Sequence, residues 1–459
     1  MRVLFATAEL APVARVGGLA AAAAGLVKEL RRSGVDVDVV LPDYAGLTLA
    51  DERVEELDVP EWAGPAFARS GLLAGVGAIT LVDSWGIRRS HPYLQPDGAG
   101  WPDNDRRFYG FSAAVAALVR RRRPDVLHLN DWHTCTALAH LERLPPTVLT
   151  IHTLGYQGWS NAGWLPGFPY HRAAYSFLDG CNPLGGGIRL ADRVIAVSPT
   201  YAAEALTVDG GFGLHDLLAA KGAHFLGILN GIDTDEWDPA GDPHIATPYG
   251  PGDLTGKDAA RAALLAELGL PAGTEPLAVM VTRLVEQKGV DLALPVVPFL
   301  AAMPARLAVL GSGERPLVEA LHGAVAAAPD RVAFREGYDE GLAHRLFAGA
   351  DLFLMPSRFE PCGLAQMQAM RYGTLPVVTD VGGLHDTVAD VDERPAEGTG
   401  IVAADVTALG VLDAVHRAVR AHRQPARRRA MQRRGMAIDW SWRGPAAQHV
   451  DLYREVATG

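Results

Sequence analysis

The sequence predicts an α/β protein of two Rossmann-like domains, each built on a parallel β-sheet with helices between successive strands. Short apolar segments alternate with helix-like segments in both halves of the chain. This pattern is typical of parallel sheets with right-handed crossovers. The 459 residues also exceed what one hydrophobic core usually supports, so two domains are expected.

The first half begins with an apolar strand over 2–7, followed by a helix over 18–32 that is rich in Ala and Leu and ends at Gly34. Alternation of Val with Asp then predicts a strand over 35–40. Strands and helices alternate again in the second half of the chain, where one helix is expected from Gly363 to Tyr372. Its predicted strands lie at 277–281, 306–310, 332–335, 352–355 and 375–379.

The boundary between the two halves is expected within 233–252, where Asp, Pro and Gly cluster. We therefore place the first domain at 1–240 and the second at 241–435. The last segment, 436–459, contains a further predicted helix.

Composition excludes several classes of protein. An apolar fraction of 49% is typical of a globular protein, and a net charge of −11 argues against nucleic acid as a partner. No apolar run reaches about 18 residues, and the chain enters a strand without a signal peptide, so no membrane partner is expected. The three cysteines are widely spaced and odd in number, which predicts a reducing, cytoplasmic environment.

The turn around Glu360 and Gly363 is the most informative local feature. It joins the predicted strand at 352–355 to a helix, which is where an open α/β sheet binds anionic ligands. Gly363 allows the backbone to approach a ligand, and the first free N–H groups of the helix suit a diphosphate. Glu360 is placed to accept hydrogen bonds from sugar hydroxyls. The turn therefore predicts a nucleotide-sugar site, and a solvated Glu in an ordinary loop is the alternative.

Two cations follow another predicted strand of the same half. Arg283 and Lys288 stand five residues apart across the strand end and its loop. Fixed cations stabilise the negative charge that develops on a departing diphosphate, without any metal ion. Cations in loops are often only solvated, but their place beside the Glu360 turn indicates a phosphate clamp.

These motifs, with others in a fixed order along the chain, resemble the bacterial glycogen synthases and plant starch synthases. The resemblance covers nearly the whole sequence. The matching segments are AELAP at 8–12, RVGGL at 15–19, NDWH at 130–133, TIH at 150–152, VSPTY at 197–201, GILNGID at 227–233, GY at 337–338, RFEPCGL at 358–364, YGTLP at 372–376 and GGL at 382–384.

The resemblance implies a GT-B fold, in which two Rossmann-like domains face each other across a deep cleft. It also implies retaining transfer from a nucleotide-sugar donor to an α-glucan or oligosaccharide acceptor. The first domain would be the acceptor side, the second would bind the nucleotide sugar, and 436–459 would return to the first domain. No cofactor and no metal ion are implied, and no His or Cys cluster suggests a metal site.

Site residues follow from the same resemblance. The expected catalytic residues are His152, Arg283, Lys288 and Glu360. The expected donor-binding residues are Arg15, Gly17, Gly18, Asn230, Tyr338, Cys362, Gly363, Leu364 and Tyr372, where the two tyrosines would lie near the nucleotide base. The expected acceptor-side residues are Glu9 and Asp131.

The sequence departs from the family pattern at Arg15, Ala21, Thr153 and Ala365, where the family usually has Lys, Asp, Asn and Thr. Three interpretations follow. The first is a glycogen synthase that tolerates these changes. The second is a pseudo-glycosyltransferase of secondary metabolism, of the acarbose type, which couples a nucleotide-activated cyclitol to an amino-oligosaccharide and elongates glycogen weakly or not at all. The third is a non-catalytic protein that binds a nucleotide or glucan.

Overall fold

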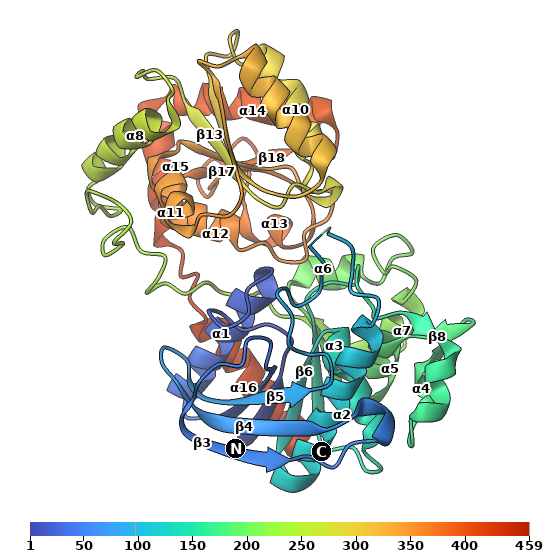
Figure 1. Ribbon diagram of the computed structural model, residues 1–459. Coiled ribbons are helices and arrows are strands. Elements are labelled where there is room, and N and C mark those ends of the chain that lie inside the picture. The colour runs from blue at the N-terminus through green and yellow to red at the C-terminus, as the bar shows by residue number, and fades with distance from the viewer. Residues whose placement is uncertain (97, 459) are drawn as a thin grey trace. The chain divides into compact units, whose positions relative to one another are not determined.

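The computed structural model describes residues 1–96 and 98–458, and the chain divides into two compact units. Unit 1 comprises Met1–Gly231 and the terminal segment from Trp442, and unit 2 comprises Ile232–Ser441. Figure 1 shows each unit as an α/β structure, the first with the blue and green elements and the second with the yellow and orange ones. The division falls slightly before the boundary expected at 240.

Unit 1 is built on a nine-stranded sheet with the order β12-β11-β7-β6-β1-β2-β5-β4-β3. Its strands are β1 (Arg2–Ala6), β2 (Asp36–Pro42), β3 (Ala50–Glu56), β4 (Ala66–Leu73), β5 (Gly77–Ser84), β6 (Val126–Asn130), β7 (Thr147–Ile151), β11 (Arg193–Ala196) and β12 (Phe225–Gly227). A separate small sheet contains β8 (Ser160–Asn161), β10 (Gly180–Cys181) and β9 (Ser176–Phe177), in that order.

The expectation of a wholly parallel sheet is wrong at one edge of unit 1. Strand β4 runs antiparallel to both β3 and β5. The physical reason is the short connection from β4 to β5, because a tight turn can join only antiparallel neighbours, whereas a parallel pair needs a long crossover. The strands from β12 to β5 pair in parallel.

The helices of unit 1 are α1 (Gly18–Arg32), α2 (Asn104–Arg122), α3 (Trp132–Cys135), α4 (Arg172–Tyr175), α5 (Pro183–Leu190), α6 (Pro199–Glu204), α7 (His215–Ala219) and α16 (Arg443–Thr458), with short 3-10 helices at Glu61–Ala63, Thr136–His140, Ala162–Gly167 and Gly222–His224. Helix α16 packs beside α1, although the two lie at opposite ends of the chain (Figure 1). Gly25 makes this approach possible, since a Cβ there would stand 2.0 Å from the indole nitrogen of Trp442.

Unit 2 contains a six-stranded parallel sheet with the order β15-β14-β13-β16-β17-β18. Its strands are β13 (Leu277–Val281), β14 (Arg306–Gly311), β15 (Val332–Glu336), β16 (Leu352–Met355), β17 (Leu375–Thr379) and β18 (Ile401–Ala403). Its helices are α8 (Thr255–Leu268), α9 (Val290–Ala293), α10 (Arg315–Ala327), α11 (Glu340–Gly349), α12 (Ala365–Arg371), α13 (Gly382–Thr387), α14 (Ala408–His422) and α15 (Pro425–Ala437), with 3-10 helices at Glu286–Lys288 and Leu294–Phe299.

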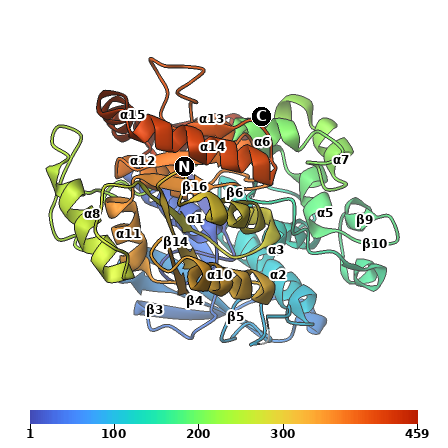
Figure 2. The ribbon, with the colours of Figure 1, turned by 90° about the horizontal axis from the view of Figure 1, so that it is seen from above.

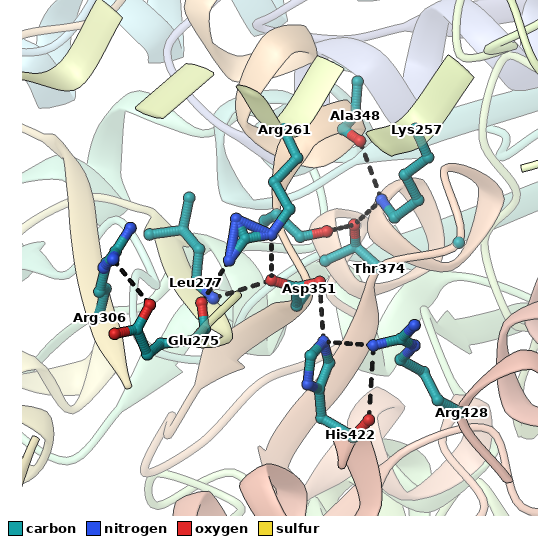
Figure 3. Close-up of polar contacts among 12 residues, drawn as sticks. Lys257, Arg261, Glu275, Leu277, Arg306, Ala348, Asp351, Thr374, His422 and Arg428 are labelled. Carbon is teal, nitrogen blue, oxygen red and sulfur yellow. Dashed lines mark hydrogen bonds and ion pairs between the residues drawn. The ribbon is translucent and has the colours of Figure 1, made fainter. Parts of the chain in front are cut away.

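Helices α8 and α11 of unit 2 lie side by side (Figure 2). A buried cation, Lys257 of α8, joins this pair to the sheet. Its ammonium lies 2.7 to 3.3 Å from four acceptors, the carbonyl oxygens of Phe347, Ala348 and Tyr372 and the Thr374 hydroxyl, which share its three N–H groups. Figure 3 shows the contacts to Ala348 and Thr374. Burial lowers the pKa of Lys257 to about 7, whereas four acceptors around one amine favour its charged form. Lys257 therefore satisfies backbone carbonyls at the ends of α11 and α12.

A second buried polar group ties helices to the sheet at the start of β16. The Asp351 carboxylate accepts a hydrogen bond from the backbone N–H of Leu277, 2.9 Å away, and pairs with Arg261 and His422 at 3.1 and 3.0 Å (Figure 3). Burial alone would raise the pKa of Asp351, but the hydrogen bond to His422 contributes to a lowered pKa for this carboxyl group.

None of the helices in the described residues has the length and apolar character that a bilayer crossing requires.

Candidate functional site

Two loops at the carboxyl ends of neighbouring parallel strands bring the predicted residues of unit 2 together. The Lys288 loop (282–289) follows β13, and the Glu360 loop (356–364) follows β16, which pairs with β13. Two hydrogen bonds join the loops: the Arg358 N–H donates to the Gln287 carbonyl at 2.8 Å, and the Gln287 amide donates to the Phe359 carbonyl at 3.1 Å. These two hydrogen bonds therefore hold the two loops together.

Gly289 is required for this close approach. Its φ is +65°, and a Cβ at this position would stand 1.9 Å from the Pro356 carbonyl oxygen. Any side chain would push the Lys288 loop away from the Glu360 loop.

Lys288 and Glu360 form an ion pair, with 2.6 Å between Nζ and Oε2. The same carboxylate oxygen accepts a hydrogen bond from the Ser357 hydroxyl at 3.0 Å. Both side chains are largely buried, with exposed fractions of 15% for Lys288 and 7% for Glu360. Arg283, in contrast, is exposed, and its guanidinium has no ion-pair partner among residues 1–96 and 98–458. The two expected cations thus occupy different environments.

The glycine turn before α12 is held by a residue that the sequence did not indicate. Gly363 has a φ of +69°, and a Cβ there would meet the Gln366 side chain at 2.5 Å. The Gln366 amide donates to the carbonyls of Cys362 and Gly363 at 3.1 and 2.9 Å. Leu364 directly precedes the helix as its N-cap residue. The turn thus has a defined shape, and its binding of a diphosphate stays a prediction.

The two tyrosines expected near the nucleotide base differ in the structure. Tyr338 follows β15 and is 68% exposed. Tyr372 is fully buried, its hydroxyl donates to Asp242 at 2.5 Å, and its ring packs near Trp237 and Phe347. The expectation that Tyr372 stacks on a base is therefore corrected, because its ring faces are covered by the core of unit 2.

In unit 1, Glu9 shapes the glycine loop. One carboxylate oxygen accepts hydrogen bonds from the N–H groups of Val16 and Gly17, both at 2.9 Å. The other accepts from the Tyr93 hydroxyl at 2.8 Å. Glu9 is 4% exposed, whereas Gly17 and its neighbour Gly18 are exposed, as is Arg15. Glu9 was expected on the acceptor side, and its observed contacts give it a part in holding this loop.

Asp131 and His152 lie at the carboxyl ends of the paired strands β6 and β7. Asp131 has a φ of +53°, and its carboxylate accepts a hydrogen bond from the His152 N–H at 2.7 Å. Burial raises the pKa of Asp131 to about 7 and lowers the pKa of His152 to about 3. The His152 imidazole is therefore neutral, and its Nε2 lies 3.0 Å from the Asn130 amide oxygen.

A small cavity in unit 1 has His152 and Asn230 in its wall. The cavity lies against α1 and α16, and two predicted site residues therefore share its wall. It is lined by Phe5, Ala22, Ala23, Leu26, Asn130, Thr150, His152, Ile195, Val197, Ile228, Asn230, Trp442 and His449.

Sequence reasoning missed several residues that support the predicted ones. Tyr93 bonds Glu9, Asn130 bonds His152, Ser357 bonds Glu360, and Gln366 shapes the Gly363 turn. Asn130 directly precedes Asp131 and Ser357 lies three positions before Glu360, so nearness in the sequence could have indicated them. Tyr93 is 84 positions from Glu9, and no local pattern links the two.

Comparison with known proteins supports the motif-based resemblance. The starch synthase catalytic domain matches residues 2–220, and the group 1 glycosyl transferases match residues 275–420. Glycogen synthase 1 of Methylococcus capsulatus is 41% identical, with 100% of this chain and 97% of that protein covered. A glycogen synthase of Anaeromyxobacter dehalogenans is 42% identical, with both chains fully covered.

A solved structure of a starch synthase is also similar to this chain. The catalytic domain of starch synthase IV from Arabidopsis thaliana, bound to ADP and acarbose, superposes with a TM-score of 0.88 at 32% identity, covering 100% of this chain and 99% of that one. The expectation of a GT-B fold is thereby confirmed. Several glycogen synthases are 41 to 42% identical to this chain over its full length. The chain therefore belongs to the glycogen synthase family and is a retaining glycosyltransferase.

Proposed function

We propose that the protein transfers a glucosyl unit from a nucleoside diphosphate glucose to the 4-hydroxyl of an α-1,4-glucan, with retention of configuration. The observation that carries the proposal is the pairing of Lys288 with Glu360 across two loops joined at the ends of adjacent strands. In the proposed reaction, the cation acts on the diphosphate and the adjacent carboxylate accepts hydrogen bonds from sugar hydroxyls. The relatives named glycogen synthase, matched over their full length, support a glucan as acceptor.

In this reaction Arg283 and Lys288 stabilise the departing diphosphate, and Arg15 with the loop of Gly17 and Gly18 adds further contacts to it. Glu360 and His152 orient the donor sugar, and Asp131 lies on the acceptor side. Fixed charges of this kind act without covalent participation of the protein, and losing one commonly lowers the rate by about 100- to 1000-fold.

We propose further that the reaction needs no metal ion and takes place in the cytoplasm. Within the described ranges, one group of side chains has metal-binding geometry: Glu236, Glu340 and His344 offer ligand atoms within 4.8 Å of one another. His344 also bonds the Asp242 carboxylate through Nδ1, at 2.8 Å. Turnover that is unchanged after treatment with EDTA supports a metal-free reaction, and loss of turnover that added metal restores contradicts it.

The test is a matrix of donors and acceptors. ADP-glucose, UDP-glucose and a nucleotide-activated cyclitol are each offered with glycogen, maltooligosaccharides and an amino-oligosaccharide, and products are identified by mass spectrometry. We expect stepwise elongation of the glucans by hexose units, with new α-linkages in the NMR spectrum, and elongation about 100- to 1000-fold slower with Arg283→Ala. Product formed only from the cyclitol and the amine would overturn the proposal.

A further inference from the structure

His152 and its neighbour Asn130 form a contact whose hydrogen positions can be assigned. The distance between His152 Nε2 and Asn130 Oδ1 is 3.0 Å, and the Asn130 Nδ2 lies 3.0 Å from the carbonyl oxygen of Ala6. Asn130 is 1% exposed, so its amide group has no water to compensate a wrong orientation.

The carbonyl of Ala6 determines how the Asn130 amide is oriented. A backbone carbonyl can only accept a hydrogen bond, so the amide NH₂ must face it and the amide oxygen must face His152. The opposite orientation would place two acceptors 3.0 Å apart in a buried site. An amide oxygen also only accepts, and therefore His152 Nε2 must carry the hydrogen.

A neutral imidazole with its hydrogen on Nε2 has a lone pair on Nδ1. The low pKa of His152 excludes the doubly protonated form near neutral pH. The backbone of His152 is also fixed, because its N–H donates to the Asp131 carboxylate at 2.7 Å. Among the residues that the structure describes, Nδ1 has no hydrogen-bond partner.

We propose that Asn130 is a positioning residue that holds His152 in the Nε2–H tautomer, so that Nδ1 accepts a hydrogen bond from a hydroxyl of the donor sugar. The second half of this statement rests on the proposed function. His152 then selects nucleotide sugars by whether one position of the sugar carries a hydrogen-bond donor. A hydroxyl or an amine satisfies Nδ1, whereas hydrogen or fluorine at that position leaves it unpaired.

The tautomer is tested by NMR of the full chain labelled with ¹⁵N in histidine. The His152 signals are identified by their loss in His152→Gln. We expect Nε2 to show the shift of a protonated ring nitrogen and Nδ1 that of an unprotonated one. Asn130→Leu, which removes the acceptor at similar volume, should give a mixture of tautomers. Asn161→Leu, elsewhere in unit 1, should leave the His152 signals unchanged. A hydrogen on Nδ1 in the wild-type protein would overturn the proposal.

Donor selection is tested with deoxy, deoxyfluoro and deoxyamino analogues of the nucleotide sugar at each hydroxyl position. At one position, the deoxy and fluoro analogues should both lose about tenfold in kcat/KM while the amino analogue does not. Asn130→Leu should reduce this discrimination and lower kcat, with the KM for the acceptor unchanged. Fluoro analogues that all react as well as the parent would show that His152 does not accept from the sugar.

The two tests separate this inference from the proposed function. If no nucleotide sugar is turned over, the proposed function fails, and the NMR measurement still decides the tautomer. If turnover is normal and Nδ1 carries the hydrogen, this inference fails and the proposed function stands.

Discussion

Lys288 and Glu360, 72 residues apart in the sequence, form an ion pair of 2.6 Å between two loops that hydrogen bonds join. The carboxylate stands at a buried position, and Lys288 is its cationic partner. Lys288 therefore has two roles. In the folded protein it compensates the negative charge of Glu360, and in the proposed reaction it contributes positive charge toward the diphosphate.

Arg283→Ala and Lys288→Ala should affect turnover similarly and stability differently. Each should lower kcat by about 100- to 1000-fold, because each removes a charge that acts on the leaving group. Only Lys288→Ala should also lower the free energy of unfolding, by about 1 to 3 kcal/mol, since it leaves a buried carboxylate without its cation. Urea unfolding and steady-state kinetics measure both effects. Near wild-type turnover in either variant at saturating donor would refute the phosphate clamp.

Gly289→Ala should separate the two loops. The new methyl group would collide with the Pro356 carbonyl and adopt an unfavourable φ of +65°. We expect a loss of about 3 kcal/mol in unfolding free energy together with reduced turnover. Gly323→Ala is the matched control, because this helical glycine has open space around its Cβ position and should gain stability. Equal behaviour of the two variants would show that the close contact is unimportant.

Lys257→Met should destabilise unit 2. The methionine keeps the apolar stem but removes the donor for three carbonyls and one hydroxyl in a buried site. We expect a loss of about 3 kcal/mol in unfolding free energy. Arg315→Met on α10, an 87% exposed cation, should change it by less than about 0.5 kcal/mol. Circular dichroism during urea unfolding provides the comparison, and a neutral effect of Lys257→Met would contradict the assigned contacts.

Asp131→Asn should change how stability depends on pH. The pKa of Asp131 is raised from 3.8 to about 7, so the folded protein keeps a proton that the unfolded chain releases between these values. The wild-type protein therefore loses stability as pH rises from about 4 to 7, by up to about 4 kcal/mol. Asparagine cannot ionise, and the variant should gain relative stability over this range. A constant difference between the two proteins from pH 4 to pH 8 would rule out the raised pKa.

Local patterns in the sequence were sufficient to place many elements of the fold. The predicted strands at 277–281, 352–355 and 375–379 and the helix at 18–32 coincide with β13, β16, β17 and α1. Hydrophobic periodicity and Gly or Pro at element ends act over a few residues, so they can be recognised without knowing what packs against them. The short motifs also identified the family, because each keeps its residues in one continuous segment.

Only the tertiary structure decided which of these segments meet. Strand order brings the loops after β13 and β16 together, so that Lys288 pairs with Glu360, and it places Asn130 at the end of β6 beside His152 at the end of β7. It also buries Tyr372, which the motif alone placed at a nucleotide. A residue's partners depend on contacts between segments distant in sequence, and those contacts follow from the packing of the whole sheet rather than from local propensity. The sequence by itself thus determined the elements, their order and the family, while the packing of the sheets decided which side chains share a site.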